Sequence, residues 1–156
     1  MNKGNAEKIC TASMQDLVPL MTELLQAGQT VRFTPKGYSM LPMLREGRDS
    51  VLLSPVPEKL KKYDLALYRR DNGAYVLHRI VGVGENYTCL GDNQFILEPN
   101  LRRDQFVALV TGFRRNGCDY SVNHSGYRMY CRIWFYSRGI RHFIRRARGW
   151  LGRHLK

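Results

Sequence analysis

The chain has 156 residues, 44% of them hydrophobic and 24% charged, enough for one domain and not comfortably two. Its 25 Lys and Arg residues outnumber its 13 Asp and Glu residues, which gives a formal net charge of +12. All of the acidic residues lie at or before Asp119, and nine basic residues follow Tyr127. The function of the basic C-terminal tail is therefore considered separately from the function of the nearly neutral body.

No uncharged apolar run approaches the ~18–20 residues that a membrane-spanning helix needs. An apolar stretch near the N-terminus is interrupted by Asp16 and Glu23, unlike a secretory signal peptide. The four cysteines are Cys10, Cys89, Cys118 and Cys131. Their spacing contains no CxxC pair and no metal-site pattern, so we expect buried, reduced thiols and neither a metal nor a cofactor. These features favour a cytoplasmic protein that can associate peripherally with a membrane.

Residues 13–27 are predicted to form the first helix, because apolar residues recur on one face at three- and four-residue spacing. These residues are Leu17, Leu20, Met21, Leu24 and Leu25. Pro19 favours a helix start near Asp16 or Leu17, and Gly28 favours the helix end. The apolar face is expected to pack on the core.

Six short β-like runs follow, separated by turns. They cover residues 30–34, 50–54, 64–70, 74–84, 87–92 and 105–115. The sequence Asp71-Asn72-Gly73 predicts a hairpin turn between the third and fourth runs. The pattern predicts a mainly β fold, a compact and partly closed antiparallel structure.

From Tyr127 apolar residues recur every three or four positions, with arginines mainly between them, which is typical of a basic amphipathic helix. The apolar positions are Ile133, Tyr136, Ile140, Phe143, Ile144, Ala147, Trp150, Leu151 and Leu155. Residues 128–156 could lie on an anionic membrane surface, or pack on the β-domain or a partner, or hold nucleic acid. Nucleic acid is disfavoured, because no base-reading motif accompanies the charge. The predicted organisation is a helical segment (1–28), a β-domain (29–117) and a helical tail (118–156).

Three residues could carry chemistry together. Ser39 lies in the loop KGYSMLP after the first β-run, but most loop serines are turn residues, and a serine hydroxyl is inert unless a base takes its proton. His78 is the one histidine in a predicted strand, where histidines are usually structural. Asp92 lies in a Gly-Asp-Asn turn, where it could orient a base or simply form the turn.

The array GYSMLPML, KKYDLALYRR, YVLHRIVGV and YTCLGDNQ resembles the signal peptidase I / LexA-like superfamily of serine peptidases. The resemblance runs from about Thr30 to Gly112 and implies the LexA/signal-peptidase type of β-fold and a serine endopeptidase. It implies Ser39 as nucleophile and His78 as general base, where many members use Lys. Asp92 matches the aspartate of the family's GDN box and is expected to assist, and Glu98 is a candidate second acid.

The implied mechanism is acyl transfer to serine. A neutral imidazole, with a pKa near 6.5, accepts the Ser39 proton without heavy burial. Backbone N–H groups would hold the oxyanion, with Gly37, Tyr38 and Met40 as candidate oxyanion or loop-support residues. The family's usual preference is for small residues before the cleaved bond.

The sequence departs from the family pattern in its "GD" boxes, which read Gly47-Arg48-Asp49 and Tyr63-Asp64. We also expect 156 residues to leave room for neither the family's membrane anchor nor its DNA-binding domain, which disfavours a DNA-linked repressor. Self-cleavage at Ala27-Gly28 is disfavoured, because Gly28 fits a helix end. The alternative function is a non-catalytic binding module of the same fold that docks to a membrane surface or a partner through its basic tail.

Overall fold

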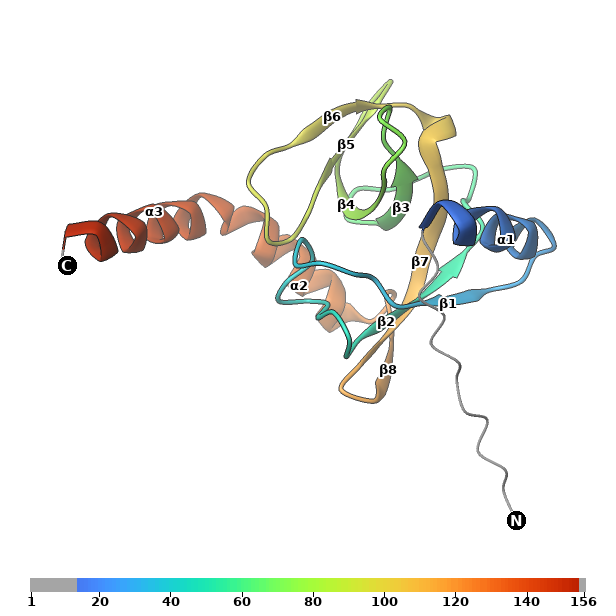
Figure 1. The fold of residues 1–156 in the computed structure, drawn as a ribbon, viewed down its shortest axis with the longest axis horizontal. Coiled ribbons are helices and arrows are strands. Elements are labelled where there is room, and N and C mark those ends of the chain that lie inside the picture. The colour runs from blue at the N-terminus through green and yellow to red at the C-terminus, as the bar shows by residue number, and fades with distance from the viewer. Residues whose placement is uncertain (1–13, 155–156) are drawn as a thin grey trace, which may run out of the picture.

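The computed structural model describes residues 14–154 (Figure 1), so Cys10 and Leu155 lie outside the described residues. The elements in chain order are α1 (Met14–Gln26), β1 (Val31–Phe33), β2 (Ser50–Ser54), β3 (Leu65–Arg69), β4 (Tyr75–Val83), β5 (Tyr87–Leu90), β6 (Glu98–Leu101), the 3-10 helix η1 (Arg103–Gln105), β7 (Phe106–Arg115), β8 (Cys118–Ser121), α2 (Ser125–Tyr136) and α3 (Arg138–His154). All six β-runs predicted from the sequence form strands, whereas β6 and β8 were not predicted.

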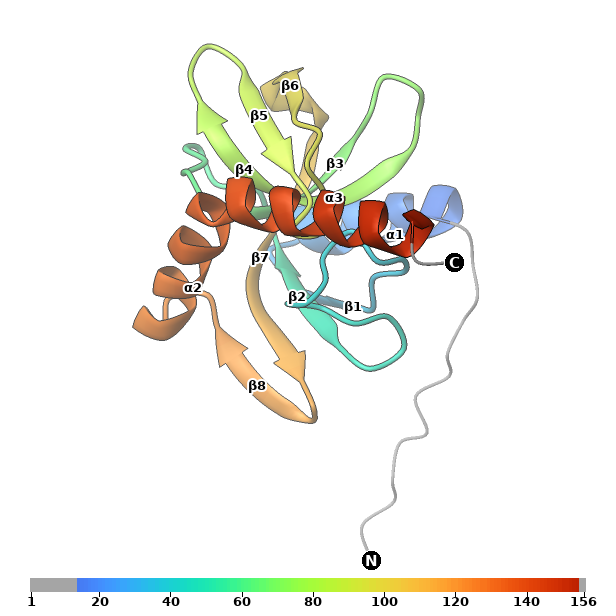
Figure 2. The same cartoon turned by 90° about the vertical axis from the view of Figure 1, so that its left-hand side faces the viewer.

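The strands form one antiparallel sheet in the order β1-β2-β7-β3-β4-β5-β6, with β8 paired to β7. This confirms a mainly β fold. The long strand β7 crosses the middle of the molecule between β2 and β3 (Figures 1 and 2). The end strands β1 and β6 do not pair with each other, so the sheet is open where a partly closed one was expected. At one end, β6 contains Pro99, whose nitrogen cannot donate to a further strand.

The two faces of the sheet pack into different cores, as the alternation of side chains along a strand requires. On β3, Leu65 and Leu67 belong to the larger core, which α1 covers, whereas Ala66 and Tyr68 belong to a smaller one. His78 on β4 pairs with Ala66 and therefore faces the smaller core.

Helix α1 begins at Met14, before the predicted start at Asp16, with Pro19 inside it. A proline at this position removes one helical hydrogen bond and crowds the carbonyl four residues earlier, and the packing of α1 on the core outweighs this cost. Its buried face includes Val18, while Leu20, expected in the core, is exposed. Gly28 ends the helix with a φ of +76°, a conformation that favours glycine.

The C-terminal tail forms two helices, where one was expected. The carbonyl of Trp134 accepts hydrogen bonds from the side chains of Ser137 (3.1 Å) and Arg141 (2.6 Å), which replace the regular helical donor where α2 ends. The expected tail also begins too early, because residues 118–121 form β8. Cys118 on this edge strand is exposed, whereas Cys89 and Cys131 are buried as expected. Within residues 14–154 no helix is both long and apolar enough to cross a membrane.

Candidate active site

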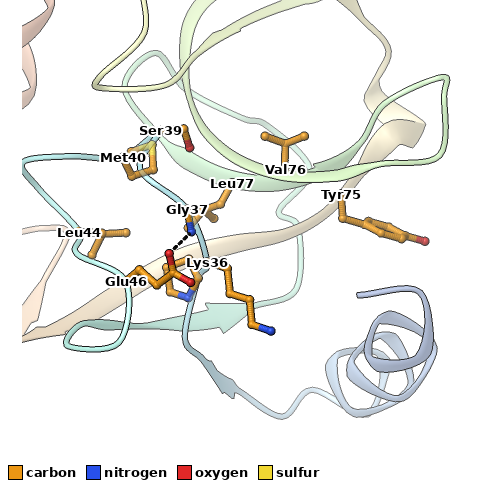
Figure 3. Close-up of a pocket in the computed structure, with 10 residues that line it drawn as sticks. Lys36, Gly37, Ser39, Met40, Leu44, Glu46, Tyr75, Val76 and Leu77 are labelled. Carbon is orange, nitrogen blue, oxygen red and sulfur yellow. Dashed lines mark hydrogen bonds between the residues drawn. The ribbon is translucent and has the colours of Figure 1, made fainter. Parts of the chain in front are cut away.

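The loop between β1 and β2 holds Ser39 in a half-buried position beside β4 (Figure 3). Gly37 turns the chain with a φ of +89°, and its N–H donates to the Glu46 carboxylate at 2.9 Å. Met40, directly after the serine, is buried in the larger core. The loop is therefore fixed on both sides of Ser39.

The turn after β5 supports this loop from the other side. The backbone N–H of Asn93 donates to the Ser39 carbonyl at 2.8 Å, and the Asn93 side chain donates to the Tyr38 carbonyl at 3.1 Å. Among residues 14–154, the backbone N–H groups of Ser39 and Met40 have no hydrogen-bond acceptor. Two adjacent amide donors are thus available at the serine.

His78 on β4 is fully buried, and its Nδ1 atom has two polar neighbours. It lies 3.0 Å from Oε1 of Glu98 and 3.1 Å from the Tyr68 hydroxyl. The Tyr68 hydroxyl donates its only proton to Oε2 of Glu98, at 2.8 Å. We infer that the imidazole proton is on Nδ1, because a carboxylate can only accept, and that Nε2 carries the lone pair.

The Nε2 atom of His78 is buried and has no hydrogen-bond partner within the described part of the chain. It faces the Ser39 loop across Gly91. A Cβ atom placed on Gly91 would lie 3.0 Å from His78 Nε2 and 2.8 Å from the Ser39 carbonyl oxygen. Because glycine has no side chain, the imidazole and the serine loop can approach each other here. The Ser39 hydroxyl and His78 Nε2 are not hydrogen bonded to each other in this structure.

Glu98 reaches His78 from β6. Burial alone would raise the pKa of Glu98, but hydrogen bonds from Arg70 and Tyr68 outweigh it and hold that pKa below its usual value. Arg70 contacts both carboxylate oxygens, including a 2.8 Å bond from its Nε to Oε2. The carboxylate beside His78 is therefore charged. Burial lowers the pKa of His78, and the Glu98 charge offsets only part of this effect. The imidazole is neutral at pH 7.

Asp92, expected to assist His78, makes its contacts elsewhere. Both carboxylate oxygens bind the Arg79 guanidinium at 2.8 Å, and the Tyr130 hydroxyl donates at 3.3 Å. Neighbouring side chains on a strand face opposite sides, so Asp92 is held by Arg79, and its charge raises the pKa of His78 less than the charge of Glu98 does. The carboxylate at the imidazole is Glu98, the residue named as second acid, and Asp92 serves the other face of β4.

Arg79 joins the sheet to α2. Burial lowers its pKa, but the charge and hydrogen bonds of Asp92 outweigh this effect and keep the guanidinium protonated. Its NH1 atom donates to the Tyr127 hydroxyl at 3.0 Å and to Cys131 Sγ at 2.9 Å. Tyr127 and Cys131 belong to α2, so this buried cation on β4 anchors that helix to the sheet.

The tail helices also hold the turn after β5. Trp134 Nε1 donates to the Asp92 carbonyl at 2.7 Å, and Arg141 donates to the same oxygen at 3.2 Å. Arg145 on α3 donates to the Asn93 side-chain oxygen at 2.7 Å. Because Asn93 binds the Ser39 loop, a short chain of contacts links α3 to the serine.

A small cavity of about 80 Å³ opens beside Ser39, between its loop and residues 75–77 of β4 (Figure 3). Gly37, Met40, Leu44 and Leu77 contribute to its wall. Lys36 and Glu46 also line the space, which has room for a small side chain only.

Three residues of this site were missed in the sequence: Tyr68, Arg70 and Asn93. The predicted hairpin, with its alternation of faces, contained a signal for Tyr68, because Ala66 pairs with His78 and Tyr68 lies two residues further on the same face. Arg70 follows at the same spacing. Asn93 was read only as part of a turn, and no sequence feature pointed to the loop that it binds.

In comparisons with known proteins, no family model and no curated protein matches the chain. The described residues place the Ser39 loop, a neutral imidazole and a charged carboxylate side by side.

Proposed function

We propose that the protein is a serine endopeptidase of the signal-peptidase/LexA-like type, with Ser39 as nucleophile, His78 as general base and Glu98 orienting the base. The observation that carries this proposal is the unpartnered Nε2 atom of His78, buried and directed at the Ser39 loop. A buried polar atom without a partner costs about 1–3 kcal/mol. A purely structural histidine would satisfy both nitrogens, whereas a general base needs one free lone pair.

In the proposed reaction, Ser39 Oγ attacks a peptide carbonyl while His78 Nε2 takes its proton. Glu98 accepts from Nδ1–H and stabilises the imidazolium. The imidazolium then gives its proton to the leaving amine, which leaves an acyl ester on Ser39. Water attacks the ester, His78 takes a proton from this water, and the acid product departs as the proton returns to Ser39.

The oxyanion would be held by the free N–H groups of Ser39 and Met40. Gly37 is unsuited as a donor, because its N–H binds Glu46. Its role is to shape the loop, and Tyr38 contributes a carbonyl that Asn93 holds. The residues named from the sequence thus divide into one donor, Met40, and two supports.

The small cavity beside Ser39 favours substrates with a small residue, such as alanine, before the cleaved bond. The mainly antiparallel β fold, with the serine loop between β1 and β2, supports a fold of the LexA/signal-peptidase type, although its sheet is open. Catalytic hydrogen bonds often tighten only when substrate is bound. We propose that the Ser39–His78 hydrogen bond forms in that complex.

A peptide library with alanine at varied positions, incubated with the full chain and read by mass spectrometry, tests the proposal. We expect cleavage after small residues, lost in Ser39→Ala and kept in Ser125→Ala, an exposed serine at the start of α2. Circular dichroism should show both variants folded, because the Ser39 hydroxyl has no hydrogen bond to lose within residues 14–154. Cleavage that persists in Ser39→Ala would refute the assignment. Wild-type protein that neither cleaves the library nor reacts with a fluorophosphonate would support the binding-module alternative.

A further inference from the structure

Helix α3 is attached to the rest of the protein by its polar face. Arg145 contacts Asn93, and its guanidinium lies 4.7 Å from the ring centroid of Phe95. His142 stacks on the same ring at 4.7 Å, and Arg141 binds the Asp92 carbonyl. Helices of soluble domains usually turn their apolar face to the core. In α3 this arrangement is reversed.

The apolar face of α3 is consequently turned away from the domain. The exposed fractions are 67% for Ile140, 74% for Phe143, 46% for Ile144 and 56% for Trp150. With 3.6 residues per turn, these four residues fall on one side of the helix, opposite Arg141 and Arg145. Figure 1 shows α3 extending beyond the sheet, with most of its length clear of the strands. A contiguous exposed apolar face marks a binding surface.

Charge indicates what binds this face. Arg146 and Arg148 flank the apolar side on its two borders, and both are exposed without an ion pair within the described residues. No acidic residue follows Asp119 in the sequence. Two copies packed through this face would therefore bring like charges together. Anionic headgroups above an acyl layer match both the apolar face and its basic borders.

We propose that α3 lies in the interface of a membrane containing anionic lipids, with Ile140, Phe143 and Trp150 inserted below the headgroups. Arg146 and Arg148 extend their aliphatic stems along the helix and bind headgroup phosphates. This docking does not depend on the chemistry proposed for Ser39. It places the candidate site beside the bilayer, because Arg145 of the docked helix contacts the turn that holds the serine loop.

Flotation of the full chain with vesicles tests the proposal, using phosphatidylcholine alone and phosphatidylcholine with 30 mol% phosphatidylglycerol. We expect at least tenfold tighter binding to the anionic vesicles, weakened by salt. The double variant Ile140→Ser/Phe143→Ser should lose at least tenfold in affinity. Its matched control, Leu20→Ser/Val83→Ser, alters two exposed apolar residues elsewhere and should bind as wild type.

Charge and insertion are tested separately. Arg146→Glu/Arg148→Glu should abolish the preference for anionic vesicles, whereas Lys59→Glu/Arg69→Glu, which reverses two exposed charges on the body, should keep it. Tryptophan emission should shift to the blue on binding, and Trp150→Phe should lose most of this shift.

Three results would overturn the proposal. The first is unchanged vesicle binding in Ile140→Ser/Phe143→Ser, which would make the association purely electrostatic. The second is a wild-type protein that does not bind vesicles but binds a short RNA tightly, with an RNA affinity that Ile140→Ser/Phe143→Ser leaves unchanged. The third is a wild-type dimer in sedimentation that the same substitution converts to monomer, which would assign the apolar face to a second copy of the chain.

Discussion

His78 and Glu98 lie on strands separated by β5, and their Nδ1 and Oε1 atoms are 3.0 Å apart. The long side chain of Glu98 spans this gap across one face of the sheet. Arg70 and Tyr68 each donate a hydrogen bond to Oε2 of the Glu98 carboxylate and so fix its position. The imidazole is thus oriented by a group that is itself fixed, which a positioning role requires.

Replacement of Glu98 by Gln should lower kcat on the order of 10²-fold or more, because the imidazolium loses its counter-charge. The loss of this charge also lowers the pKa of His78 further, so the acid limb of the rate profile should move to lower pH. Steady-state rates between pH 4.5 and 8 measure both effects. The control Glu58→Gln, at an exposed carboxylate, should change neither. An unmoved acid limb would mean that Glu98 does not act through His78.

The pH dependence of stability should reveal the buried imidazole. The pKa of His78 lies below 6.5 in the folded chain, so between these two values the unfolded chain binds more protons. The contribution of His78 to the free energy of unfolding is fully present above pH 6.5. It is lost as the pH decreases from 6.5 to the pKa of the folded state. Urea titrations at several pH values should show this slope, and His78→Gln should remove it. The exposed His124→Gln should retain it.

Replacement of Gly91 by Ala should separate His78, the proposed base, from the loop of Ser39, the proposed nucleophile. The new methyl group would meet the Ser39 carbonyl at 2.8 Å and His78 Nε2 at 3.0 Å, so one of them must move. We expect kcat/KM to fall about 10²-fold, as displacements near 1 Å can cost, with a stability loss of about 1–3 kcal/mol. Gly139→Ala, where no atom lies within 4 Å of the new methyl group, should be fully active. Equal activity of the two variants would contradict the proposed contact.

Replacement of Asp92 by Asn should destabilise the fold by about 3–5 kcal/mol, because it leaves the buried Arg79 charge without its partner. Chemical denaturation measures this loss. In the fraction that remains folded, the acid limb of the rate profile should move less than in Glu98→Gln, since Asp92 acts mainly on Arg79. A larger movement would return Asp92 to the role of orienting acid.

The sequence contained enough to predict the sheet and the first helix, because alternation, turn residues and apolar spacing are local signals. Ser39 and His78 were named from the resemblance of their motifs to a known family, and no local pattern alone set them apart. Glu98 could be named but not placed, since β6 reads Glu-Pro-Asn-Leu and includes Asn100 at a φ of 62°. Such a strand has no β-like composition, and tertiary pairing with β5 determines it. Asp92 was expected beside His78 because of its motif. In the structure it binds Arg79, whose side chain lies on the opposite face of β4 from that of His78. The division of the tail at Ser137 depends on side chains that bind one carbonyl, which spacing alone does not reveal.

The neighbouring positions of His78 and Arg79 on β4 also help to determine the register in which this strand pairs with its neighbours. A slip of one residue in a strand turns all of its side chains to the opposite face. In β4 this slip would bury a permanent cation in a space shaped for a neutral ring, and would leave Asp92 facing an imidazole. Glu98 and Asp92, which bind His78 and Arg79 respectively, therefore favour the observed register of β4. A strand shifted by one residue would lose both electrostatic contacts, so the shifted pairing would be less stable.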